Sequence, residues 1–337
     1  MMARFRMLFL QAGLSTFSAA SAATAPPAVL TPFIHDGSFE PGDYGFVRDA
    51  FSGATAQQVA DWKAIEAYGK ACMHDAALVQ DAELKKLGVA ASVPEQSGYQ
   101  DHVCMQVNMA AAAPSGFKSW EDFQTAMSRS VPYFQTYEAA VHGAVQALES
   151  NPTKDTLEEQ LTARTLPDQM WRFPMMGRSL QEIAGLDAST HTALSSRISL
   201  AVINVDWDNS HWARHVLETQ GWASVLKAGH KPAKMLWTLV QHADVDPVFQ
   251  VMALRQLEPL ARSGQFPKQG YALLTDRVML ATTGKQHYGS QLSCQSHHYA
   301  PISLDAGGGN PKTLDARRAD MNLPPEATYL KRFPAHC

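Results

Sequence analysis

The chain lacks several features that would point to common classes of protein. Beyond its N-terminus it has no run of about 18 consecutive apolar residues, the length that a membrane-spanning helix needs. Its lysines and arginines are not clustered, and its formal net charge of -4 differs from the basic charge typical of nucleic-acid-binding proteins. A phosphate-binding loop, a dinucleotide-binding fingerprint and a serine nucleophile elbow are also missing. We therefore expect no nucleic-acid partner, no transmembrane segment after the N-terminus and no cofactor.

Cysteine is scarce, with only Cys72, Cys104, Cys294 and Cys337 present. An even number of cysteines in an oxidising compartment favours disulfides. We expect Cys72 to pair with Cys104 and Cys294 with Cys337, because each pair then lies within one region of the chain. Buried free thiols are the alternative.

The N-terminus has the layout of a secretory signal peptide. Arg4 and Arg6 precede an apolar run over residues 7–17, and the small residues Ala20-Ser21-Ala22 follow. This layout predicts cleavage near residue 22 and a mature protein that is secreted or periplasmic. A disordered N-terminus that stays attached is the alternative.

The rest of the chain has the composition of a globular protein, with 45% hydrophobic and 18% charged residues. After the signal peptide (1–22), the prolines of residues 23–50 predict an extended tether. Residues 51–151 are predicted to form an N-terminal helical region, and residues 152–337 a helical domain. The expected fold class is therefore mainly α and bundle-like. The segments "KQHYGSQL" and "HHYAPISL" predict a small β-hairpin near the C-terminus.

Capping residues mark the expected helix starts. A polar cap followed three residues later by an acidic residue or glutamine occurs at Thr55, Ser119, Thr156 and Ser179. Asp246-Pro247 predicts a further start, because aspartate is a good N-cap and proline fits the first helical position.

Polar residues gather at the end of one apolar helix, in "LWTLVQHADVDPVFQ" (236–250). Gln241 and His242 border the apolar arc of this helix, and the chain is expected to turn over residues 242–246, where Asp244 lies. Such a junction concentrates polar side chains. One interpretation is a functional site; the other is that His242 and Asp244 only satisfy backbone groups at the turn.

An arginine stands within the apolar arc of a second helix, "LLTDRVML" (273–280). A buried guanidinium needs a carboxylate or an anionic ligand, because an unpaired buried charge costs several kcal/mol. Asp244 or Asp246 could reach Arg277 from the other helix, and Asp276 lies on the neighbouring face. An interhelical salt bridge and a ligand-binding role are the two interpretations.

The spacing of His211, His215 and Glu218 places these residues on one face of a helix. Histidines four residues apart are typical of metal ligands, but Trp212 stands where the zinc-protease pattern requires glutamate. We therefore expect no metal site.

Four blocks occur in a fixed order in the second half of the chain: "GWASVLKAG" from 221, "LVQHADVDPVFQ" from 239, "LLTDRVML" from 273 and "KQHYGSQ" from 285. Together they resemble an uncharacterised, mainly helical bacterial domain family. Its members typically carry a Gly-Trp-Pro element, Gln-His with an acidic residue, Asp-Arg, and Gln-x-Tyr-Gly-Thr-Gln. Ala223 replaces the proline and Ser290 the threonine. With weaker likeness in "LTARTLPDQMWR" and "LDARRADMNLPPEATYL", the resemblance covers about residues 155–337. It implies a fold and a set of residues, but no reaction.

The resemblance supplies the polar residues that we expect to meet between helices. The candidate catalytic residues are His242, Asp244, Asp276 and Arg277. The candidate ligand-binding residues are Asp168, Gln169, Arg172, Gln241, Gln286, Tyr288 and Gln291.

Two hypotheses follow, and the sequence does not decide whether the protein is an enzyme. In the first, these residues form a polar pocket for a small polar or anionic ligand. Arg277 then pairs with the anion, and His242 is the general acid or base of a hydrolase or lyase, because histidine has a pKa of about 6.5. In the alternative, the protein is a non-catalytic envelope interaction or structural module whose polar network only stabilises helix packing.

Overall fold

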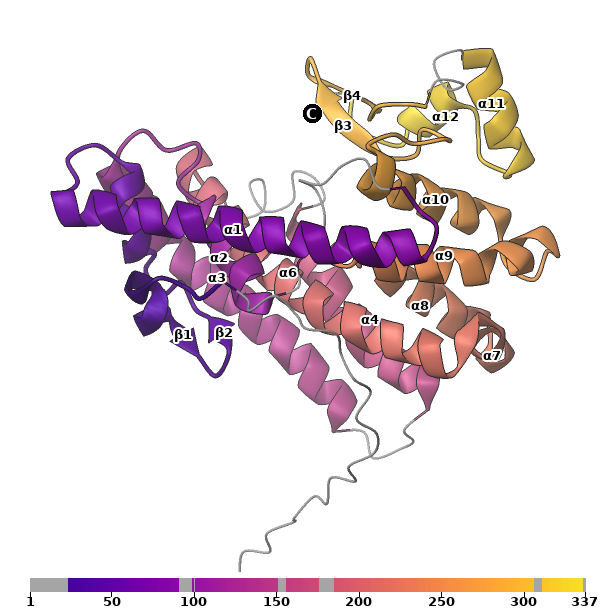
Figure 1. The fold of residues 1–337 in the computed structure, drawn as a ribbon, viewed down its shortest axis with the longest axis horizontal. Coiled ribbons are helices and arrows are strands. Elements are labelled where there is room, and N and C mark those ends of the chain that lie inside the picture. Colours follow the sequence, from indigo (N-terminus) through magenta and orange to yellow (C-terminus); the bar gives the residue numbers. More distant parts are fainter. Residues whose placement is uncertain are drawn as a thin grey trace, which may run out of the picture.

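The structure is a computed structural model that describes residues 24–90, 99, 101–150, 156–175, 185–305 and 311–335. Its class is mainly α, as the sequence predicts (Figure 1). The N-terminal elements are η1 (Ala28–Phe33), β1 (Ile34–His35), β2 (Ser38–Phe39), η2 (Gly45–Ala50), α1 (Ala56–Lys86), α2 (His102–Ala111) and α3 (Trp120–Glu149). The later elements are α4 (Leu157–Arg172), η4 (Phe173–Met175), α6 (Ala188–Thr219), α7 (Gly221–Ala228), α8 (His230–Gln241), α9 (Pro247–Arg262), α10 (Lys268–Thr283), β3 (Leu292–Gln295), β4 (His298–Pro301), α11 (Pro311–Asp320) and α12 (Glu326–Leu330).

Side-chain caps begin four helices where the sequence predicts them. These caps are Thr55 for α1, Ser119 for α3, Thr156 for α4 and Asp246 for α9. Thr55 and Thr156 each form the reciprocal hydrogen bonds of a capping box, and Pro247 occupies the first turn of α9. The start predicted at Ser179 lies outside the described residues, as does the predicted signal peptide (1–22).

The segment before α1 is packed, whereas the prolines of residues 23–50 predict an extended tether. Leu30, Phe39 and Val47 are at most 1% exposed and lie in a cluster with residues of α1, α2 and α3. The backbone N–H of Phe39 donates to the side chain of Gln106 in α2 at 2.7 Å. The difference arises because apolar side chains between the prolines anchor the segment, so that the prolines mark turns and short helices.

A disulfide between Cys72 and Cys104 joins α1 to α2, which confirms the expected pairing. Cys337 lies outside the described residues, so the pairing of Cys294 with Cys337 stays a prediction. No helix in the described ranges is long and apolar enough to cross a membrane.

The main hydrophobic core lies among α4 and α6 to α10. Trp222, Leu236 and Phe249 are nearly inaccessible in its centre, and the indole N–H of Trp222 donates to the Ala253 carbonyl at 3.1 Å. α3 packs along α6, and α1 crosses both halves of the molecule, so that Leu84 near its end joins the same core (Figure 1). The domain boundary predicted near residue 152 falls outside the described residues.

The hairpin near the C-terminus is present, but it begins later than predicted. β3 pairs antiparallel with β4, and Cys294 lies opposite Tyr299. Residues 285–291 form a loop instead of the first strand. Their polar groups turn inward onto a buried carboxylate, which is described below.

Candidate functional site

The predicted site residues fall into three neighbouring sets instead of one. The first set is Asp168, Gln169, Arg172 and His242; the second is Gln241, Asp244 and Arg277; the third is Asp276, Gln286, Tyr288 and Gln291. Within the described part of the chain, no side-chain hydrogen bond or ion pair links one set to another. The three sets are therefore separate in their side-chain contacts.

The first set is completed by an aspartate from α6. We refer to Asp168 and Arg172 of α4, Asp206 of α6 and His242 at the end of α8 as the Asp-His cluster. The Arg172 guanidinium donates to Asp168 Oδ1 at 2.6 Å and to the two carboxylate oxygens of Asp206 at 2.6 and 2.7 Å. Asp168 is fully buried, and the side chain of Arg172 is 17% exposed. One cation thus joins two buried carboxylates.

Helical spacing places these groups together. In α4, Leu161, Thr165, Asp168 and Arg172 recur three or four residues apart, which puts them on one face against α6 and α8. Asp206 occupies the corresponding buried face of α6. His242 is the C-cap residue of α8, so its ring enters the cluster from a helix end.

His242 is oriented by the buried carboxylate. Its Nδ1 lies 2.9 and 3.0 Å from the two oxygens of Asp168. Because an ionised carboxylate only accepts hydrogen bonds, Nδ1 carries a proton in this pair, and the lone pair of neutral imidazole lies on Nε2. No hydrogen bond to Nε2 occurs among the described residues, and the His242 side chain is 20% exposed. A ring held in one tautomer with its second nitrogen free is the arrangement of a general base.

Asp206 is a second group that can hold a proton near neutral pH. Its pKa is raised to about 6 from 3.8: burial is the largest cause and the neighbouring Asp168 acts in the same direction, whereas Arg172 and His242 oppose the shift. Asp206 is not among the residues predicted from the sequence. Asp206 lies one turn after Val202 on the apolar face of its helix. A charged residue on an apolar face needs a buried partner, which is the sequence signal that also indicates Arg277.

The second set contains the interhelical salt bridge that was one interpretation of Arg277. Arg277 of α10 donates to Asp244 at 2.5 Å, and the exposed fractions of these side chains are 27% and 59%. Gln250 of α9 donates to the other oxygen of Asp244 at 3.2 Å. Two buried donors, Arg277 Nε and Gln241 Nε2, have no hydrogen-bond partner within the described residues. Buried donors are normally paired, so these two atoms are places where an oxygen atom of a ligand or water would be favourable.

The third set holds a loop. Asp276 is fully buried, and its carboxylate accepts the backbone N–H groups of His287, Tyr288 and Ser290 at 2.7 to 2.8 Å. Gln286, also fully buried, donates to the carbonyls of Gln291 and Ile302. These contacts fix residues 286–291 at the end of α10.

Arg318 of α11 supports the same loop and was absent from the predicted site residues. It is fully buried and donates to the carbonyls of Tyr288 and Pro324 at 2.6 and 2.7 Å. The adjacent charges in "LDARRAD" gave no sequence signal that separates Arg318 from Arg317. Tyr288 and Gln291 take part in these contacts through their backbone groups. The third set therefore fixes the conformation of the loop.

A metal ion could be held only by part of the Asp-His cluster within the described ranges. Ligand atoms of Asp168, Asp206 and His242 lie within 4.8 Å of one another. Carboxylate and imidazole suit divalent cations, but the Arg172 guanidinium already contacts both carboxylates, so a metal ion would have to displace it. In the helical pattern of His211, His215 and Glu218, the Nδ1 atom of His211 lies 2.8 Å from the Trp207 carbonyl oxygen.

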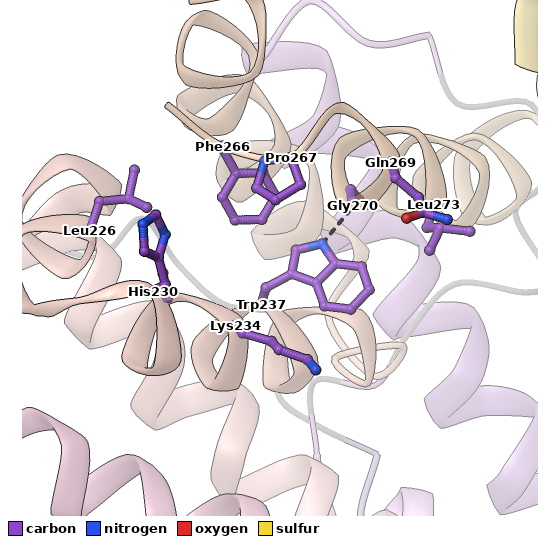
Figure 2. Close-up of a pocket in the computed structure, with 10 residues that line it drawn as sticks. Leu226, His230, Lys234, Trp237, Phe266, Pro267, Gln269, Gly270 and Leu273 are labelled. Atoms are coloured by element: carbon purple, nitrogen blue, oxygen red, sulfur yellow. Dashed lines mark hydrogen bonds between the residues drawn. The ribbon is translucent and has the colours of Figure 1, made fainter. Parts of the chain in front are cut away.

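Two surface grooves, of about 300 and 270 Å³, lie away from these sets. The larger is formed by α7, α8 and α10, and Figure 2 shows the side chains that line it. The smaller is lined by residues of α3 and α6, including Tyr137 and Ile198. Neither groove is lined by a predicted site residue.

Comparison with known proteins identifies the C-terminal half of the chain. A family of unknown function, DUF6624, matches residues 160–335, which include all three sets. This agrees with the uncharacterised domain family expected from the sequence over about residues 155–337. No curated protein and no solved structure matched in the corresponding comparisons. Because the match spans more than half of its length, the chain belongs to DUF6624, a family of unknown function.

Proposed function

We propose that the Asp-His cluster is the acid–base centre of a hydrolase or lyase that acts on a small polar or anionic molecule. The observation that carries the proposal is the pairing of His242 Nδ1 with the fully buried Asp168, while the His242 side chain keeps an exposed fraction of 20%. Such a pair orients the ring and stabilises the imidazolium that forms when Nε2 takes a proton.

Each member of the cluster then has a role in moving or holding a proton. His242 Nε2 accepts a proton from water or from the substrate, and Asp168 stabilises the resulting charge. Asp206, with its pKa raised to about 6, is the candidate second acid or base. Arg172 keeps the two carboxylates close together in spite of their mutual repulsion.

The second set supports an oxygen-rich ligand. Arg277 Nε and Gln241 Nε2 are buried donors without a described acceptor, and Gln241 directly precedes His242 in the chain. A carboxylate or phosphate oxygen would satisfy them, since hydrogen bonds to charged groups are stronger than neutral ones. Arg277 and Gln241 then donate to the ligand, and the ligand oxygen takes a place beside Asp244 as an acceptor for Arg277.

The competing proposal is a non-catalytic envelope interaction or structural module. Its support is that Asp168 already accepts hydrogen bonds from Arg172, Gln169 and His242, so the network is satisfied without a ligand. A buried network of this kind contributes to packing and specificity on its own.

Replacing His242 by asparagine distinguishes the two proposals. The matched control is His215→Asn, an exposed histidine of α6. Both proteins and the wild type are assayed against chromogenic esters, phosphate monoesters and 2-hydroxy acids, and their free energies of unfolding are measured by urea titration. We expect His242→Asn to lower turnover by about 100-fold or more, the usual contribution of a general base, and His215→Asn to leave it unchanged.

Two results would reject the catalytic proposal. One is equal turnover in wild type and His242→Asn. The other is a wild type with no turnover on any compound, combined with a loss of about 1.5 to 3 kcal/mol in His242→Asn, which is the contribution of one hydrogen bond to a charged group, since Asp168 stays paired with Arg172.

We also propose that the protein is exported to a secreted or periplasmic location. The layout of residues 1–22 and the disulfide between Cys72 and Cys104 support this, because disulfides persist mainly in oxidising compartments. N-terminal sequencing of protein recovered from the medium or periplasm should begin near residue 23. An intact Met1 on all recovered protein would contradict export through this signal.

A further inference from the structure

The larger groove has an apolar floor that reaches the surface. His230, Ala233, Lys234 and Trp237 lie along one face of α8, at the spacing i, i+3, i+4 and i+7. Trp237 is held in place because its indole N–H donates to the Gly270 carbonyl in α10 at 3.0 Å (Figure 2). The ring therefore stays at the surface of the groove, available to an apolar molecule.

The opposite wall comes from α7, α10 and the segment between α9 and α10. Leu226, Phe266, Pro267 and Leu273 supply apolar surface there. A Cβ atom on Gly270 would come within 2.9 Å of the Phe266 ring, so the close approach of the ring to α10 requires glycine at this position. The volume of about 300 Å³ is at the lower end of the range for small-molecule sites.

The one formal charge among the residues that line the groove is positive. None of the 10 residues that line it is acidic, and Lys234 stands at its edge beside Trp237 (Figure 2). Lys234 makes no ion pair with a described residue, whereas Lys231 on the same helix pairs with Glu158 at 2.8 Å. The groove therefore offers a free ammonium group next to apolar surface.

Two helix N-termini add to this positive potential. α8 begins at His230 and α10 at Lys268, and neither has a side-chain cap on its first N–H groups. Residues of both first turns, His230 and Gln269, line the groove. Helix N-termini favour anions, so they act in the same sense as Lys234.

We propose that this groove binds a small amphiphilic carboxylate, of the class of a medium-chain fatty acid. Its hydrocarbon part lies against Trp237, Phe266 and Leu226, and its carboxylate is close to Lys234 and the first turn of α8 or α10. The groove and the Asp-His cluster share no residue: the groove is lined on α8 by residues from His230 to Trp237, and His242 follows five residues later, about 7.5 Å further along the helix axis. The site does not depend on the function proposed for His242.

Calorimetric titration of the full chain with octanoate, 1-octanol and octylammonium tests the proposal. We expect octanoate to bind more tightly than 1-octanol and octylammonium to bind least. Lys234→Met should weaken octanoate about fivefold and leave 1-octanol unchanged, in keeping with the contribution of an exposed ion pair. Lys231→Met is the matched control, on the same helix but paired with Glu158 outside the groove, and should bind octanoate like the wild type.

A second variant tests the location of the hydrocarbon part. Leu226→Gln keeps the size of a partly exposed side chain but makes it polar, so it should weaken octanoate and 1-octanol by the same factor. Thermal melting of each variant confirms that it is folded. The proposal is overturned if octanoate does not bind, if 1-octanol or octylammonium binds as tightly as octanoate, or if Lys234→Met and Lys231→Met have equal effects.

Discussion

Replacing Asp206 by asparagine should change how the free energy of unfolding depends on pH. Asp206 is 7% exposed, and burial raises its pKa in the folded protein to about 6 from 3.8. Between these two values the folded protein retains a proton that the unfolded chain releases. By linkage, the free energy of unfolding of the wild type therefore falls as pH rises through this window and levels off above about pH 6.

The size of the effect follows from the difference between the two pKa values. A difference of about 2 pH units corresponds to about 3 kcal/mol at 1.36 kcal/mol per unit. Most of this, roughly 2 to 3 kcal/mol, is lost between pH 4 and pH 7. An asparagine side chain does not titrate, so the free energy of unfolding of Asp206→Asn should lack this decrease. Relative to the wild type, the variant should gain about 2 to 3 kcal/mol over the same range.

Urea unfolding followed by far-ultraviolet circular dichroism at several pH values measures this difference. Asp208→Asn is the matched control, because Asp208 is an exposed aspartate two residues further along the same helix. Comparing the two variants removes the effect of other titrating groups. The reasoning would be refuted if the pH profiles of wild type and Asp206→Asn were parallel, or if the wild type gained stability relative to the variant as pH rises.

Three further changes test the structural contacts by denaturant titration. Asp276→Ala should lower the free energy of unfolding by about 3 kcal/mol or more, because it leaves buried backbone donors without an acceptor; a loss below about 1 kcal/mol would contradict this. The double change Cys72→Ser and Cys104→Ser should cost about 3 to 4 kcal/mol, since the disulfide closes a loop with a sequence separation of 32, and reduction of the wild type should match it. Thr156→Ala should cost about 1 kcal/mol through loss of the α4 cap, whereas Thr156→Ser should cost little.

Helix starts were predictable because their chemistry is local. The cap of α4 depends on Thr156 and a residue three positions later, and no distant part of the chain is needed to form it. The Cys72–Cys104 pair was expected on similar grounds, from closeness in the sequence. The packing of residues 24–50 was not predictable from their prolines, because it depends on buried apolar residues between the prolines, such as Leu30 and Phe39.

The partners within the candidate site depend on tertiary structure and were only partly predictable. Helix-face reasoning selected Arg277 as a residue that needs a carboxylate, and Asp244 provides one. The pairing of His242 with Asp168 spans 74 positions in the sequence, and periodicity within one helix contains no information about it. Asp206 joins these residues only because α6 packs against both α4 and α8.

The turn between α8 and α9 explains why polar residues are spaced as they are in "QHADVD". Alternate residues of the turn contact three different helices. His242 binds Asp168 of α4, Asp244 binds Arg277 of α10, and Asp246 binds Arg214 of α6. The apolar residues between them, Ala243 and Val245, are buried. A segment without helical periodicity therefore ties the α8–α9 junction to three neighbouring helices.

The three polar residues of this turn differ in how far their structural contacts leave them available to bind a ligand. Asp246 is used twice, as the cap of α9 and as the partner of Arg214, so its role is accounted for by structure. Asp244 has a side chain that is 59% exposed, and its ion pair with Arg277 should contribute at most about 1 kcal/mol to stability. His242 alone combines a buried partner with a ring nitrogen that is free of described contacts. A chemical role of the turn therefore depends on His242. The ion pair between Asp244 and Arg277 can break to let Arg277 bind a ligand, with little loss of stability.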